Sequence, residues 1–194
     1  NIICEGSENV KSLRCRYHGR QFELTGKFKF MPEFEQCENF PSERDNLPKV
    51  NFKIFNNLIF TSLNPASPFE EFFKEIKERL HWFPFDKLVL DSNRSKDYLV
   101  KAHWALYCEN YLEGFHIPYI HKSLNDALDY ANYTQEIYKY TNLQVGRAKS
   151  GEVIFENSPE KDIAAYYYWI FPNMMFNFYP WGLSINIVRP IEKD

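Results

Sequence analysis

The spacing of apolar residues changes abruptly at residues 64–68, and this change most limits the folds open to the chain. Before it, short apolar runs broken by glycine and proline indicate strands, and residues 50–55 and 58–60 flank Asn56 and Asn57 as the arms of a hairpin would. After it, apolar residues recur at helical spacing, with Ser67 as expected N-cap and Pro68 as first helical residue. These apolar residues are Phe69, Phe72, Phe73, Ile76 and Leu80. We therefore predict one domain over residues 1–65 and a second over 66–194.

The second domain alternates between the two types of secondary structure. Residues 86–102 look extended, and a helix is expected from Trp104 to about His116, with an interruption at Pro118. Strand-like runs then dominate, at residues 134–145, 151–155, 164–171, 174–179 and 183–188. The expected fold class is α+β, with a long helix cradled by an antiparallel sheet.

Composition excludes several classes of partner. The formal net charge of −3 and the pI near 6.0 give no basic surface for a phosphate backbone, so we expect no nucleic acid. No apolar run approaches the length of a membrane span, and no glycine-rich nucleotide fingerprint is found. Four cysteines without a regular rhythm suggest a reduced, cytoplasmic setting.

Cys15 and His18 form a C-x-x-H pair that is followed by Gly19. A thiolate and an imidazole at this spacing can bind one metal from a tight loop, and the glycine allows the backbone to turn beside it. The alternative is a buried thiol next to an exposed histidine. The pair is half of a metal site at most.

A second cluster lies between Glu109 and His121. On a helix, Glu109, Glu113 and His116 would share one face. Pro118 breaks the regularity, so His121 can converge with His116 near a helix end. Two imidazoles and a carboxylate with open positions form the facial triad of Fe(II) oxygenases. The alternative is a core histidine beside a solvated acidic helix face.

Both clusters resemble motifs of one family. Residues 109–121, E-N-Y-x-E-x-x-H-x-P-x-x-H, closely resemble the iron-site signature of Rieske-type non-haem iron oxygenases, the ring-hydroxylating catalytic α subunits, especially the choline-monooxygenase-like branch. Residues 15–19 resemble the second half of the motif that binds a Rieske [2Fe–2S] cluster. The sequence departs from the pattern because the C-x-H half is missing, and because Arg16 and Arg20 replace the usual Pro and Trp.

The resemblance implies a role for each matching residue. Cys15 and His18 would be cluster ligands, and His116 and His121 would bind the mononuclear Fe(II). Glu113, where ring dioxygenases carry Asp, would be the carboxylate that bridges an iron-ligand histidine and a cluster-ligand histidine of another subunit. Glu109 and Asn110 would orient the ligands. The carboxylate ligand is expected beyond the chain, so Asp126, Asp129 and Asp194 are not assigned to it.

The resemblance also implies an architecture and a reaction. Residues 1–65 would be the C-terminal part of an all-β Rieske domain, and residues 66–194 the N-terminal part of a helix-grip (START/Bet v1-like) catalytic domain, truncated. The enzyme would be a homotrimer that takes electrons from NAD(P)H through a separate flavin-dependent reductase, with or without a ferredoxin. It would use O₂ to hydroxylate a small organic substrate, either an aromatic ring or an N-methyl or quaternary ammonium compound. The chain by itself is expected to be inactive.

Two other functions stay open at this stage. One is a helix-grip ligand-binding protein that has lost catalysis, and the other is a structural zinc protein that uses Cys15 and His18. His81 and His103 match no metal spacing and are interpreted as structural. The aromatic runs at residues 166–169, 171–173 and 179–181 are interpreted as part of the hydrophobic core. The alternative is that they form the wall of a pocket that could hold a quaternary ammonium compound.

Overall fold

The computed structural model describes residues 2–192, which form two compact units. The first holds residues up to 52 together with 60–64, and the second holds 53–59 and the chain from Pro65 onward. In the first unit, β1 (Leu13–Arg14), β2 (Gln21–Phe22) and β3 (Phe28–Phe30) form a small antiparallel sheet in that order.

Arg20 lies at the centre of the first unit. Its Nη2 contacts the Asp45 carboxylate at 2.7 Å and also donates to the Asp45 carbonyl at 2.8 Å. Its guanidinium carbon lies 5.3–5.8 Å from the ring centroids of Phe22, Phe28 and Phe40. The planar cation therefore joins the Asp45 carboxylate to three aromatic rings by ion-pair and cation–π contacts.

A hairpin of β4 (Asn51–Phe55) and β5 (Leu58–Ser62) follows, as predicted. Asn56 at its turn has a φ of 52°, in the left-handed region that asparagine tolerates. The hairpin tip groups with the second unit because Phe55 is buried there against Phe73 and Phe85.

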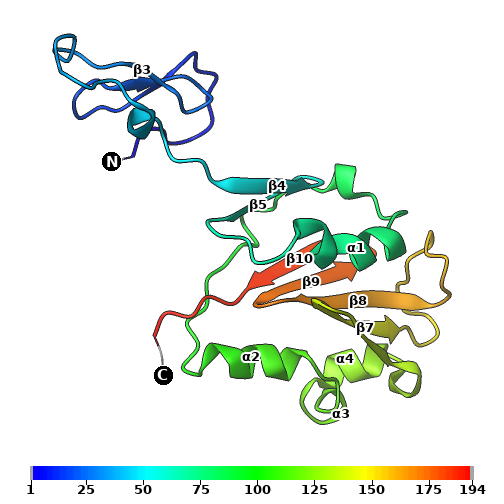
Figure 1. Cartoon of the computed structure of the whole chain (residues 1–194). Coiled ribbons are helices and arrows are strands. Elements are labelled where there is room, and N and C mark those ends of the chain that lie inside the picture. The colour runs from blue at the N-terminus through cyan, green and yellow to red at the C-terminus, as the bar shows by residue number, and fades with distance from the viewer. Residues whose placement is uncertain (1, 193–194) are drawn as a thin grey trace. The chain divides into compact units, whose positions relative to one another are not determined.

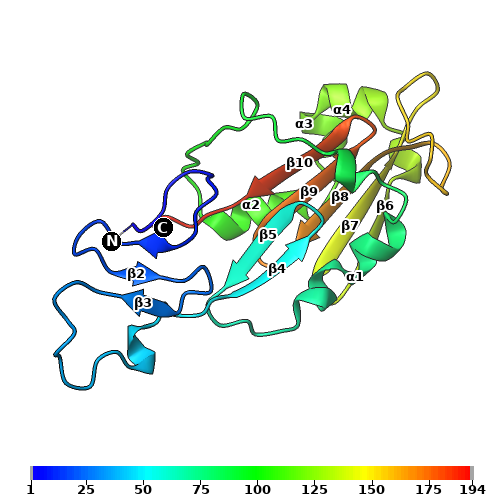
Figure 2. The same ribbon diagram turned by 90° about the horizontal axis from the view of Figure 1, so that it is seen from above.

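The second unit is built on an antiparallel meander of five strands in the order β10-β9-β8-β7-β6 (Figure 1). Helix α1 covers one face of the sheet, and the short helices α2, α3 and α4 cover the other (Figure 2). The strands are β6 (Thr134–Ile137), β7 (Thr141–Arg147), β8 (Ile163–Ile170), β9 (Met174–Tyr179) and β10 (Gly182–Ile187). The helices are α1 (Phe69–Arg79), α2 (Trp104–Tyr111), α3 (Ile117–Ile120) and α4 (Lys122–Ala127).

Strand register gives the two faces of the sheet different chemistry. One face carries the cross-strand rows Leu143–Tyr168–Phe176 and Val145–Tyr166–Phe178, and all six side chains are buried. The other face carries the rows Gln144–Tyr167–Asn177 and Asn142–Trp169–Met175. Helix α1 packs on the apolar face through Phe73, which contacts Phe176. The amide-bearing face lies beneath α2, since the Tyr111 hydroxyl donates to Asn177 Oδ1 at 2.6 Å.

Several sequence-based expectations about local structure were wrong. Residues 134–145 are a hairpin rather than one strand, and the Tyr138 N–H closes its turn by donating to the Thr141 carbonyl. Residues 86–102 and 151–155 form no strand. Pro68 rather than Ser67 is the N-cap of α1, because the Ser67 hydroxyl is hydrogen-bonded to the Tyr140 hydroxyl at 2.6 Å.

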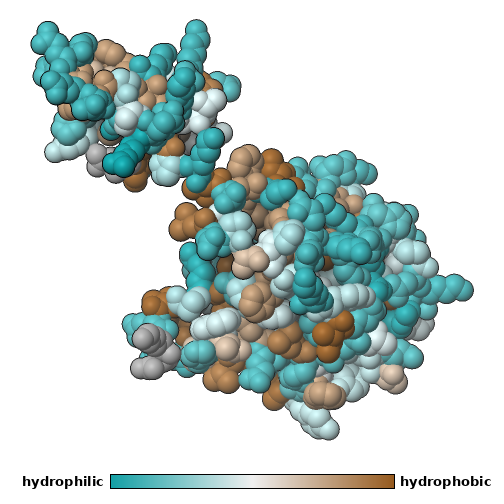
Figure 3. Space-filling model, in the orientation of Figure 1, coloured by the Kyte–Doolittle hydropathy of each residue, from teal (hydrophilic) through white to brown (hydrophobic). Residues whose placement is uncertain are grey.

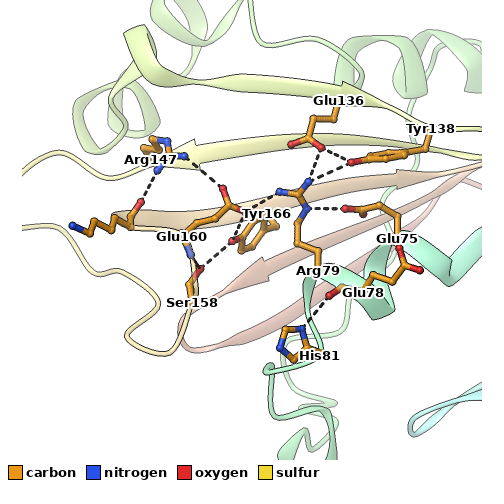
Figure 4. A network of polar contacts seen from close by, with 11 residues as sticks. Glu75, Glu78, Arg79, His81, Glu136, Tyr138, Arg147, Ser158, Glu160 and Tyr166 are labelled. Atoms are coloured by element: carbon orange, nitrogen blue, oxygen red, sulfur yellow. Dashed lines mark hydrogen bonds and ion pairs between the residues drawn. The ribbon is translucent and has the colours of Figure 1, made fainter.

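Arg79, at the end of α1, joins three carboxylates from different segments (Figure 4). Its guanidinium contacts Glu75 at 2.7 Å, Glu136 of β6 at 2.6 Å and Glu160 at 2.8 Å. Because its side chain is only 21% exposed, these contacts are mostly shielded from water. The network ties α1 to the edge strand β6 and to the loop before β8.

Apolar side chains also lie on the surface, where they are interspersed with polar ones (Figure 3). In the irregular segment 88–103, four of them are 80–90% exposed, namely Val89, Leu90, Tyr98 and Leu99. Between residues 2 and 192, no helix is long and apolar enough to cross a membrane.

Candidate metal centre

Glu113 and His116 lie in the turn between α2 and α3. The Glu113 carboxylate contacts His116 Nδ1 through Oε1, and it accepts the Phe115 N–H through Oε2. Burial opposes ionisation of Glu113, but the hydrogen bonds from His116 and Phe115 outweigh it and hold the pKa of this carboxyl below its ordinary value. The pair is thus a carboxylate held against one nitrogen of an imidazole.

This contact determines which nitrogen of His116 is available to a metal. A carboxylate at Nδ1 favours the tautomer that is protonated there, so the Nε2 lone pair is left for coordination. His121 caps the C-terminus of α3, and its ring centroid lies 5.0 Å from that of His116. Two imidazoles at this separation, one of them oriented by a carboxylate, suit a divalent metal with nitrogen and oxygen ligands.

The helix that was expected to carry Glu109, Glu113 and His116 on one face ends earlier, at Tyr111. Glu109 and Asn110 are in α2 with exposed side chains, and neither forms a side-chain hydrogen bond to another residue in the described part of the chain. Glu113 and His116 still meet because residues three apart are close in a turn as well as in a helix. The prediction that Glu109 shares one helix face with Glu113 and His116 was therefore wrong.

Gly114 and Pro118 explain why the predicted helix does not continue to His116. A Cβ atom on Gly114 would lie 2.9 Å from Tyr133 Cε1, so the backbone approaches this ring as only glycine allows. Pro118 lies in the first turn of α3, where a missing N–H costs nothing. The proline thus begins a new helix instead of only ending the preceding one, and it sets His116 and His121 at the two ends of α3.

Cys15 and His18 lie in the loop after β1. The Cys15 N–H donates to the Arg20 carbonyl at 2.8 Å, and the Gly19 N–H donates to the Cys15 carbonyl at 3.1 Å. Gly19 has a φ of 74°, as a tight turn requires. The His18 ring is exposed and lies 3.8 Å from the Tyr17 ring, centroid to centroid. The loop presents its histidine outward.

The other candidates lie apart from this centre. His103 is the N-cap of α2, where its Nδ1 accepts the Ala105 N–H, and His81 contacts the Glu78 carbonyl, so both are structural as expected. No three His, Cys, Asp or Glu side chains between residues 2 and 192 converge as ligands of one ion. Asp194 lies outside the described residues.

The residues beneath the turn were not predicted from the sequence. Tyr111, Tyr133, Gln135 and Gln144 form a hydrogen-bonded cluster there, and Gln144 is only 2% exposed. The available signal was Gln144 between Leu143 and Val145 in a predicted strand, since an amide in a buried strand needs partners. For the aromatic runs the core interpretation holds at Tyr166 and Tyr168, whereas Trp181 stacks on Tyr179 and is 68% exposed.

The fold agrees with the comparisons, which define the class of protein. The chain belongs to the ring hydroxylating alpha subunit (catalytic domain) family, whose model matches residues 85–194. It is 25% identical to the chloroplastic choline monooxygenase of Arabidopsis thaliana, over 98% of the chain and 48% of that protein. It is also 25% identical to the carnitine monooxygenase oxygenase subunit of Acinetobacter pittii (strain PHEA-2), over 99% of the chain and 53% of that protein.

Solved structures show the same fold. The quaternary ammonium Rieske monooxygenase CntA, in complex with an inhibitor, superposes with a TM-score of 0.78 at 22% identity, over 98% of this chain and 52% of that chain. The chain spans about half the length of the curated relatives it matches. The mixed helices and antiparallel sheet match the catalytic domain of Rieske oxygenases.

Proposed function

We propose that this chain carries the iron-binding turn of a Rieske-type oxygenase that hydroxylates a small organic substrate. The observation that carries the proposal is the Glu113–His116 pair with His121 beside it. His116 and His121 would hold a mononuclear Fe(II), and Glu113 would keep His116 Nε2 directed to the metal. When bound, the iron would activate O₂ for insertion into a substrate bond.

The chain's own residues have defined tasks in this proposal. Glu113 holds the proton shared with His116 Nδ1, so the ligand nitrogen keeps its lone pair. Its second oxygen accepts the Phe115 N–H, which fixes the carboxylate between backbone and ring. Glu109 and Asn110 are exposed on α2 and would act as groups near the site rather than as ligands.

For the first unit, we propose the C-terminal part of a Rieske domain, with Cys15 and His18 as one pair of [2Fe–2S] ligands. The exposed position of His18 supports this role, since a cluster must pass electrons outward. Electrons would come from NAD(P)H through a separate flavin-dependent reductase, with or without a ferredoxin. Assembly as a homotrimer would let Glu113 bridge to a cluster-ligand histidine of another subunit.

The relatives' names suggest the substrate class, an N-methyl or quaternary ammonium compound. Trp169 and Phe171, which line a pocket together with Leu112 and Asn142, support this class, because aromatic faces attract such cations. An aromatic ring remains the second substrate class that the family name suggests.

Replacing His116 or His121 with alanine in the intact gene product, purified without oxygen, is expected to remove about one iron per subunit and leave acid-labile sulfide unchanged. His81→Ala and His103→Ala are the matched controls, since both histidines lie away from the turn. Iron and sulfide analysis decides the outcome. Unchanged iron in both His116→Ala and His121→Ala would refute the assignment.

A further inference from the structure

The end of α2 is the point at which the chain is fixed before Glu113. The last carbonyls of a helix have no partner within the helix and need donors from elsewhere. Here Gln144 of β7 donates its Nε2–H to the Tyr111 carbonyl, and Gln135 of β6 donates to the Leu112 carbonyl at 3.0 Å. The two glutamines are opposite each other in the β6–β7 register. The sheet therefore caps the helix through side chains.

Tyr133 completes the arrangement from the other side. Its hydroxyl donates to Gln144 Oε1 at 2.9 Å, and Gln135 donates to the same oxygen at 3.3 Å. Because Oε1 has two donors, the Gln144 amide can only turn its N–H toward Tyr111. The Tyr133 ring lies directly under Gly114, where even one added carbon would be too close.

A third strand holds the same helix end. The Tyr111 hydroxyl donates to Asn177 Oδ1 of β9 at 2.6 Å. Tyr111 and Leu112 are thus held by β6, β7 and β9, immediately before the turn that begins at Glu113. The Gln144 amide is buried and is hydrogen-bonded through both its oxygen and its nitrogen, so it fixes one arrangement, since losing a partner leaves a desolvated polar group.

We propose that Tyr133 and Gln144 are positioning residues that fix the Glu113–His116 pair through the backbone of residues 111–114. Neither forms a hydrogen bond to Glu113 or His116 among the described residues, so their effect is transmitted by the end of α2 and by Gly114. This inference rests on the proposed function, in which the Glu113–His116 pair serves the metal. Its geometric content, a sheet-capped turn that holds one imidazole orientation, can be tested without metal.

The test replaces Gln144 with methionine, which keeps the volume and removes both hydrogen-bonding groups. Amide hydrogen exchange at residues 112–117 is expected to accelerate roughly tenfold, while β8 and β9 keep their protection. Tyr133→Phe is expected to give a smaller increase in the same residues, because Gln144 still donates to Tyr111. In both variants, side-chain nitrogen shifts at a pH where the His116 ring is neutral should show a mixture of tautomers instead of one.

Asn142→Leu is the matched control. Asn142 lies on the same strand and the same face, and its buried Oδ1 has no hydrogen-bond partner among the described residues. It should leave exchange at 112–117 and the His116 tautomer unchanged. If amide exchange in Gln144→Met accelerated equally across β7–β9, Gln144 would have a merely structural role. If exchange at residues 112–117 were unchanged, Gln144 would not position the turn at all. Both readouts are metal-free, so their failure overturns the positioning role alone, whereas retained iron in the histidine variants overturns the proposed function.

Discussion

Replacing Arg79 with methionine is expected to lower the free energy of unfolding by about 3 kcal/mol, near the lower end of the range for breaking a buried ion pair. The substitution keeps the aliphatic length of the side chain but removes the cation from Glu75, Glu136 and Glu160. Glu75 and Glu136 would then lose their cation, and Glu160 would keep only its longer contact with Arg147 at 3.5 Å. The glutamates at the edge of the network are 32–35% exposed, so water relieves part of the cost.

Urea denaturation of the purified chain measures this change. Lys53→Met is the matched control, because the Lys53–Glu70 pair has the same 2.7 Å contact but 57% and 58% exposed side chains. An exposed pair of this kind contributes about 0–1 kcal/mol, so the control should differ little from the parent chain. If Arg79→Met were no more destabilised than Lys53→Met, the network would not stabilise the second unit.

The second large effect is expected at high pH, where we predict cooperative unfolding. Burial is the first cause that raises the pKa of six tyrosines above the ordinary value of 10.0: Tyr111, Tyr133, Tyr166, Tyr167, Tyr168 and Tyr179. Burial and the Glu136 hydrogen bond raise the pKa of Tyr138 to about 12. Above pH 10.0 the unfolded chain loses these protons while the folded chain keeps them, so stability falls as pH rises.

Each buried tyrosine that stays protonated removes about 1.4 kcal/mol of stability per pH unit in this window. With several such groups, the sheet should unfold before its tyrosines ionise in the folded state. Tyrosinate absorbance and circular dichroism followed together on raising the pH should change in one shared transition. Gradual tyrosinate formation with unchanged circular dichroism would contradict the burial of these hydroxyls.

Local pattern was enough to predict part of this structure. The apolar spacing of residues 69–80 predicted the helix that becomes α1, and Phe73, Ile76 and Leu80 are buried. The hairpin around Asn56 and the strands β8 to β10 also follow from short-range signals. In the site, the three-residue spacing of Glu113 and His116 indicated their contact, because that spacing brings side chains together in several backbone conformations.

The features that could not be predicted from the sequence are polar contacts between residues far apart along the chain. The end of α2 at Tyr111 is capped by Gln144, 33 residues later, and periodicity carries no information about such a contact. Arg79 meets Glu160 across 81 positions, and Arg20 meets Asp45 across 25. These polar contacts are decided by tertiary packing, which overrides local helical preference.

Metal analysis of the intact gene product, purified without oxygen, tests the central assignment most directly. Together with the low-temperature EPR spectrum of the reduced protein, it reports both proposed centres at once. We predict about three irons and about two acid-labile sulfides per subunit, with the low average g-value of a cluster that has histidine ligands. Zinc in place of iron, or no bound metal, would contradict an oxygenase built on Cys15, His18, His116 and His121.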